Sequence, residues 1–239
     1  LKQWGTGLVI LLLTLFNARL GWWLGNPRHL NERRKIGPTH ALLPIINELA
    51  GKTDAESEWV YISDGGHFDN LGIYEMVRRG CRYIVAVDSS ADPRFEFDSL
   101  GIAIRNIRID FGISIDLVGS LRIGEKTQGE AGAHCSLFEI GYQERIGGAD
   151  TDGYLLYIKA SHYPRGPNSP VDVRQYAAGM SSFPHEPTSN QFFGESQFES
   201  YRALGEWEIS KITAFEKAVN SLPHFFTLAN AHISLYQSD

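Results

Sequence analysis

Residues 58–88 of the 239-residue chain, EWVYISDGGHFDNLGIYEMVRRGCRYIVAVD, carry its clearest secondary-structure pattern. Residues 58–63 predict a strand, and residues 64–66, Asp-Gly-Gly, predict a tight turn. Residues 70–79 predict a helix, and residues 82–88, which are almost continuously apolar, predict a fully buried strand. A strand, a helix and a second strand in this order form a βαβ unit, which implies a parallel sheet covered by helices. The expected fold is therefore α/β, with a mostly parallel central sheet flanked by helices.

Asp64 is the strongest candidate for a functional residue. In parallel sheets function collects at the carboxyl ends of strands, and Asp64 directly follows the first predicted strand. Gly65 and Gly66 allow the backbone to turn sharply there and to come close to a substrate. Because the preceding strand is apolar, we expect a half-buried carboxylate that orients or deprotonates a nucleophile. The alternative is an Asx turn, in which the side chain only stabilises the bend.

Three more residues are candidates for a supporting role. His67 follows the turn, where it either contacts a substrate or only completes the bend. Asn70 stands at the start of the predicted helix, so its side chain is expected to cap that helix. Asp88 ends the second predicted strand, and its carboxylate is expected either to hydrogen-bond neighbouring turns or to support the loop of the site.

The block Tyr61–Glu75 resembles the Asp-Gly-Gly motif of patatin-like acyl hydrolases. It looks closest to bacterial proteins similar to the cytosolic phospholipase A2 catalytic domain. Residues 15–24 and 197–205 also look like segments of that group, so the resemblance spans about residues 11–208, and residues 1–10 are atypical. The resemblance implies that residues 1–239 are the C-terminal part of one patatin-like domain, with a layered fold that is incomplete at its N-terminus.

Patatin-like hydrolases use a Ser–Asp dyad without histidine. A serine in a Gly-x-Ser-x-Gly elbow attacks the ester carbonyl, the aspartate of Asp-Gly-Gly acts as its base, and a Gly-rich loop forms the oxyanion hole. The motif match gives the base role to Asp64, the active-site turn to Gly65 and Gly66, and at most a positional role to Asn70. The resemblance thus implies a lipid acyl hydrolase that acts on a phospholipid or another acyl ester and requires no metal or cofactor.

The nucleophile of such a dyad is missing from the sequence. No serine has glycine at both the −2 and the +2 position, and no Gly-rich loop precedes Asp64. In the family both elements come before the aspartate, so we expect the serine to lie upstream of Leu1 and this chain alone to be inactive. The alternative is a non-catalytic patatin-like protein that binds lipid or a partner.

Other kinds of site have weaker support. The eight histidines show neither His-x-x-x-His nor HExxH spacing, and the two cysteines cannot form a four-thiolate zinc site, so no metal centre is predicted. A nucleotide-binding domain is a further hypothesis, in which Gly65 and Gly66 approach a phosphate at the following helix. The chain lacks Gly-x-Gly-x-x-Gly and a P-loop lysine, which counts against that hypothesis.

Composition and charge narrow the function classes. The chain is 43% hydrophobic and has 22 basic and 28 acidic residues, which indicates a globular protein and excludes a basic nucleic-acid binder. Residues 8–16 are strongly apolar but shorter than the roughly 20 residues that a spanning helix needs. We expect a buried or interfacial helix there, with part of a membrane span or a signal segment as alternatives, and Trp22 and Trp23 either in the core or at a lipid surface. The protein is thus expected to be cytoplasmic or peripherally membrane-associated, with a membrane surface as a candidate partner.

Further elements are predicted outside residues 58–88. They are a helix at 39–51 or one that begins at the turn containing Pro44, strands at 134–140 and 154–159 separated by a turn at 147–150, and helices at 171–180, 195–205 and 209–222. Residues 97–110 fit either a helix or a pair of strands.

Overall fold

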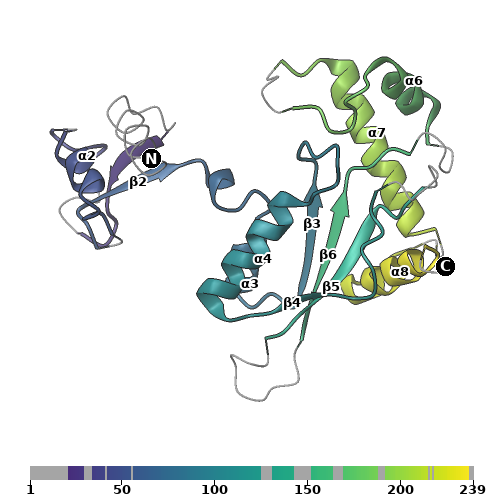
Figure 1. Ribbon diagram of the computed structural model, residues 1–239, viewed down its shortest axis with the longest axis horizontal. Coiled ribbons are helices and arrows are strands. Elements are labelled where there is room, and N and C mark those ends of the chain that lie inside the picture. The colour runs from purple at the N-terminus through teal and green to yellow at the C-terminus, as the bar shows by residue number, and fades with distance from the viewer. Residues whose placement is uncertain are drawn as a thin grey trace, which may run out of the picture. The chain divides into compact units, whose positions relative to one another are not determined.

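The chain forms two compact units, Leu1–His67 and Phe68–Asp239 (Figure 1). The computed structural model describes residues 21–29, 34–40, 42–54, 56–124, 131–142, 152–163, 169–187, 192–214, 216 and 218–236. The apolar run at residues 8–16 and the turn predicted at 147–150 lie outside the described residues. In the part of the chain that is described, no helix is both long and apolar enough to cross a membrane.

A two-stranded sheet organises the first unit. Strand β1 (Gly21–Gly25) pairs antiparallel with β2 (Trp59–Ser63), and Trp23 lies opposite Tyr61. The Trp23 ring is buried and packs edge-on against the Tyr61 ring, with 5.1 Å between the ring centroids. Trp22 is exposed, so the expectation of core packing is confirmed for Trp23 only.

The first unit also contains two short helices. Helix α2 (Leu42–Leu49) has Pro44 in its first turn, where the missing proline N–H breaks no intrahelical hydrogen bond. The start at the proline-containing turn is therefore correct, and the start at residue 39 is not. The 3₁₀ helix η1 (Gly65–His67) follows Asp64 directly.

A four-stranded sheet forms the centre of the second unit. Its order is β3 (Tyr83–Asp88), β6 (Gly153–Lys159), β5 (Cys135–Ile140) and β4 (Ile115–Leu117). Strands β3 and β6 are parallel, and Tyr83 pairs with Tyr154. Strand β5 runs antiparallel to both β6 and β4. The fold is α/β as predicted, but the sheet is mixed.

The prediction of a mostly parallel sheet is wrong, and so is the βαβ unit from which it was inferred. Strand β2 pairs with β1 in its own sheet and is not a neighbour of β3. The described residues between β4 and β6 contain no helix, and strands that follow each other without a crossover helix pair antiparallel. The order strand, helix, strand in the sequence was therefore not sufficient to predict which strands pair or in which direction they run.

The helix after the Asp-Gly-Gly turn begins later than predicted. Helix α3 spans Ile73–Arg78 and follows Gly72, whose φ of 71° lies in the left-handed region that favours glycine. The Asp69 carboxylate accepts the backbone N–H groups of Leu71 (3.0 Å) and Tyr74 (2.8 Å). Asp69 thus fills the capping role that was predicted for Asn70, which is exposed.

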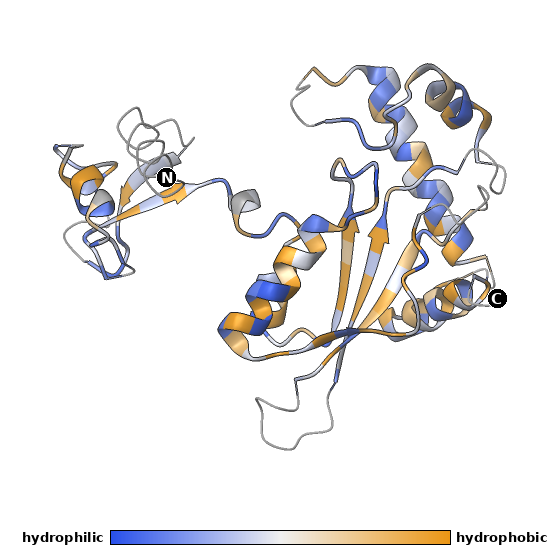
Figure 2. Ribbon diagram, in the orientation of Figure 1, coloured by the Kyte–Doolittle hydropathy of each residue, from blue (hydrophilic) through white to orange (hydrophobic). Residues whose placement is uncertain are grey.

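The two faces of the four-stranded sheet are covered by different helices. Helices α3 and α4 (Asp98–Phe111) pack on one face through Ile73, Val77 and Ile107, and α8 (Leu222–Ser234) packs on the other. Alternate strand residues point to each face, as the period of a strand requires, and Figure 2 shows the resulting apolar colouring along the strands. Helix α6 (Val171–Gly179) packs against α7 (Glu195–Ile212) beside this sheet (Figure 1).

Two ambiguities along the chain are resolved by the structure. Residues 98–111 form a helix, not a strand pair. Helix α7 continues through Gly205 to Ile212, so the helix predicted at 209–222 is wrong. The next helix begins only at Leu222, where the Ser221 hydroxyl accepts the N–H of His224 and caps it.

Candidate functional site

Asp64 lies at the carboxyl end of β2 and is exposed. Its Oδ1 accepts the backbone N–H of Gly66 at 2.9 Å, which is the hydrogen bond of an Asx turn. The expected half-burial is wrong because β2 belongs to a two-stranded sheet, in which its last residues, Ile62 and Ser63, are also exposed. The structure thus contains the Asx turn that was weighed as the alternative.

The same turn leaves half of the Asp64 carboxylate unengaged. Within the described residues, Oδ2 accepts no hydrogen bond, whereas Oδ1 is held by Gly66. One oxygen therefore fixes the rotation of the carboxylate, and the other faces solvent, where it is free to accept a proton from an incoming group. An Asx turn and a base are compatible roles for one aspartate.

Gly65 is not needed by the backbone of this turn. Its φ lies outside the left-handed region, and a Cβ at this position would meet no atom within 4 Å. The space at Gly65 itself is therefore open. Of His67, only the backbone in η1 belongs to the described part, and Asn70 lies exposed before α3.

Asp88 lies in a buried network in the second unit. The register of β3 and β6 places Asp88 beside Lys159, and the two side chains are 2% and 0% exposed. Lys159 Nζ lies 3.2 Å from Asp88 Oδ2, which also accepts the Tyr157 hydroxyl at 2.5 Å. The N–H of Ser90 donates to Asp88 Oδ1 at 2.8 Å, so the predicted hydrogen bond to a neighbouring turn is present.

The charges of this network are set by its hydrogen bonds. Burial alone would raise the pKa of Asp88, but hydrogen bonds from Ser90 and Tyr157 and the Lys159 ammonium together lower it. Burial and the Asp88 carboxylate raise the pKa of Tyr157, which therefore stays protonated. Lys159 also donates to the Ser90 carbonyl at 2.9 Å. Asp88 and Lys159 are thus a satisfied ion pair at the carboxyl ends of two parallel strands.

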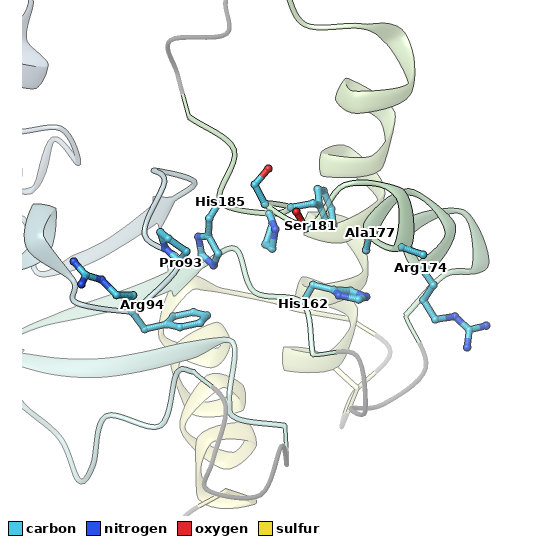
Figure 3. Close-up of a pocket in the computed structure, with 12 residues that line it drawn as sticks. Pro93, Arg94, His162, Arg174, Ala177, Ser181 and His185 are labelled. Atoms are coloured by element: carbon cyan, nitrogen blue, oxygen red, sulfur yellow. The ribbon is translucent and has the colours of Figure 1, made fainter.

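A cavity of about 710 Å³ lies close to this network (Figure 3). It is linked to the network by Asp92, whose carboxylate lies 4.0 Å from Lys159 Nζ and whose backbone N lies 3.4 Å from Nδ1 of His185 in the cavity lining. The residues that line the cavity come from three separate segments, and they are Pro93, Arg94, Phe95, His162, Arg174, Ala177, Ala178, Ser181, Ser182, Phe183, Pro184 and His185. No motif or spacing in the sequence connects these segments, so sequence analysis had no signal by which to find them.

Ser161, His134 and Glu208 form a second buried polar group that sequence analysis also missed. The Ser161 hydroxyl lies 2.7 Å from His134 Nδ1, and Glu208 Oε1 lies 3.3 Å from the same nitrogen. A catalytic triad needs the serine on one ring nitrogen and the acid on the other. Because all three side chains are also buried, this group has a structural role in joining β5, β6 and α7.

The comparisons with known proteins add no relative. No family model, no curated protein and no solved structure matches the chain. Among the described residues there is also no group of three or more His, Cys, Asp or Glu side chains arranged to hold a metal ion. A proposed function therefore has to be argued from the residues and their geometry.

Proposed function

We propose that this chain supplies the aspartate of a Ser–Asp dyad in a patatin-like lipid acyl hydrolase, with Asp64 as the base. One observation carries the proposal: within the Asp-Gly-Gly block, Asp64 follows a strand with one carboxylate oxygen held by Gly66 and the other open to solvent. The open space at Gly65 leaves room for the approach of another group. The substrate would be a phospholipid or another acyl ester at or near a membrane surface.

In the proposed reaction, Asp64 Oδ2 takes the proton of a serine hydroxyl while the serine oxygen attacks the ester carbonyl. The tetrahedral intermediate collapses, the ester C–O bond breaks, and the alcohol leaves with the proton that Asp64 accepted. Asp64 then takes a proton from water as the water oxygen attacks the acyl-serine, and it returns that proton to the serine oxygen when the bond from the acyl carbon to that oxygen breaks and the carboxylic acid is released. The hydrogen bond from Gly66 to Oδ1 holds the carboxylate in one orientation through both steps. The serine has to come from outside the 239 residues, since they contain no Gly-x-Ser-x-Gly.

The deciding substitution is Asp64→Asn in the full-length protein. The asparagine side-chain oxygen still accepts the Gly66 N–H, so the Asx turn is retained, but the base is lost. We expect kcat for hydrolysis of a short-chain p-nitrophenyl ester and of phosphatidylcholine to fall about 100- to 10,000-fold, the usual contribution of a general base.

Asp54→Asn is the matched control. Asp54 is an exposed aspartate of the same unit, and its Oδ1 accepts the backbone N–H of Glu56 at 3.0 Å, so it also makes an Asx turn. This variant should keep full activity. Full activity in Asp64→Asn would contradict the proposal. If a fluorophosphonate probe labels no serine in the wild-type protein, the non-catalytic lipid- or partner-binding alternative replaces it.

A further inference from the structure

The cavity in the second unit has a lining whose charge is opposite to that of the chain. The protein has 28 acidic and 22 basic residues, yet none of the 12 residues that line the cavity is acidic. Six of them are hydrogen-bond donors, namely Arg94, Arg174, His162, His185, Ser181 and Ser182. A concave surface with several donors and no carboxylate favours an anion.

The two histidines of the lining are neutral donors at neutral pH. Burial lowers the pKa of His162 and of His185, and nearby cations, including Arg174 for His162 and Lys159 for His185, lower both further. His185 is only 8% exposed, its Nδ1 lies 3.4 Å from the backbone N of Asp92, and its ring also hydrogen-bonds the Ser90 backbone. Nε2 is a buried ring nitrogen with no hydrogen-bond partner among the described residues, so it is unsatisfied without a ligand.

The two arginines lie on opposite sides of the histidines in Figure 3, with their side chains extended outward. Arg94 pairs with Glu96 at 3.1 Å, but both side chains are exposed, and such pairs are weak. Arg174 has no acidic partner within the described residues, and its charge acts on His162. Both arginine side chains are exposed and point away from the histidines, so each guanidinium would have to turn inward to contact an anion in the cavity.

The rest of the lining is apolar. Phe183 is buried, and Phe95 packs edge-on against His185, with 5.0 Å between the ring centroids. Pro93, Pro184, Ala177 and Ala178 complete this part of the wall. At about 710 Å³, the cavity has the volume of sites that hold organic ligands and is larger than an inorganic anion needs.

We propose that this cavity binds an organic phosphate. The phosphate would lie against the histidines and serines, with an arginine from the rim turned toward it, and the organic part would lie against Phe95 and Phe183. Arginine forks match phosphate oxygens, and a phosphate monoester offers three terminal acceptors where a carboxylate offers two, which suits the number of donors in the lining. The proposal does not involve Asp64 and is independent of the proposed hydrolase activity.

Phenyl phosphate is a suitable probe, with inorganic phosphate and phenol as its two halves. In calorimetric titrations of the full chain we expect phenyl phosphate to bind, inorganic phosphate to bind more weakly and phenol not to bind. Arg174→Gln should weaken phenyl phosphate binding about tenfold, the loss of one charge-assisted interaction. Because Arg174 is exposed, this variant should fold as the wild type does.

Arg202→Gln is the matched control, since Arg202 is an exposed arginine on α7 that pairs with Glu199 and Glu206 outside the cavity. It should bind as the wild type does. Sedimentation with phosphatidylcholine vesicles, with and without phosphatidic acid, tests whether the natural ligand is a lipid headgroup or a soluble phosphate ester. Arg174→Gln should weaken binding to both. The proposal is overturned if no phosphate compound or vesicle binds, or if the two arginine variants behave alike.

Discussion

Because the ion pair of Asp88 and Lys159 is buried, neither residue can be replaced without a loss of stability. The carboxylate and the ammonium are 3.2 Å apart and almost inaccessible to water, and Ser90 and Tyr157 satisfy the remaining groups. Removing Asp88 leaves the Lys159 ammonium buried with Asp92, 4.0 Å away, as its remaining charge partner among the described residues, and breaking a buried pair costs about 3–5 kcal/mol. The position of Asp88 at a strand end indicated a role for it. Nothing in the sequence predicted that its partner is Lys159, which follows 71 positions later.

The lowered pKa of Asp88 predicts how this contribution depends on pH. A carboxyl whose pKa is lower in the folded than in the unfolded state stabilises the fold above its ordinary value of 3.8. That stabilisation is lost as the pH falls through the folded pKa. Asp88→Asn should therefore lower the free energy of unfolding by about 3–5 kcal/mol at pH 7. The difference from wild type should shrink below about pH 4.

Urea unfolding of both proteins from pH 7 to pH 3 measures this difference, in which the titration of all other groups largely cancels. A difference that stays constant down to pH 3 would show that Asp88 is not held in its charged form.

Local sequence patterns predicted most strands and helices. Which of these elements pack or pair with each other was not predicted, because it depends on residues that are far apart in the sequence. The apolar runs predicted β3, β5 and β6 to within a residue or two at each end. The pairing of β2 was missed because it depends on β1, where Trp23 buries its ring against Tyr61. The start of α3 was also missed, since Asp69 and Asn70 are both good capping residues and stand side by side.

The two candidate caps of α3 can be separated by substitution. Asp69→Ala removes the acceptor for the N–H groups of Leu71 and Tyr74 and should cost about 1 kcal/mol. Asn70→Ala, one position further on at an exposed site, should change stability by less than about 0.5 kcal/mol. Urea midpoints at constant m-value give both numbers. A larger loss for Asn70→Ala than for Asp69→Ala would reverse the assignment.

Among the described residues, the buried apolar side chains lie mostly in the second unit. The three clusters of buried apolar side chains found in the described part of the chain all belong to Phe68–Asp239. Among the described residues of Leu1–His67, Trp23 and Pro44 are the buried apolar side chains. Composition does not predict this division, because 29 of the first 67 residues are hydrophobic, which is the same 43% as in the whole chain. The cavity was equally hidden, since its walls come from segments around residues 94, 162 and 180.

The unequal cores predict that residues 68–239 fold without the first unit. Burial of apolar surface is the main source of stability, and this part of the chain holds almost all of it among the described residues. The isolated segment should unfold in one cooperative transition in urea, followed by circular dichroism and by tyrosine and tryptophan fluorescence. A segment that lacks cooperative unfolding would show that the four-stranded sheet depends on the first unit.

The parallel pairing of β3 with β6 also has a consequence for synthesis of the protein. Tyr83 pairs with Tyr154, 71 residues later, so a ribosome adding about 5–20 residues per second produces the partner roughly 4–14 s after β3. Helix α3 precedes β3, and α4 emerges within that interval, so both are present to cover Ile84 and Ala86, while Val85 and Val87 stay bare and are still 39% and 64% exposed in the finished fold. For those seconds β3 is an unpaired apolar edge on a nascent chain, and the yield of folded protein should depend on how well the cell shields it during translation.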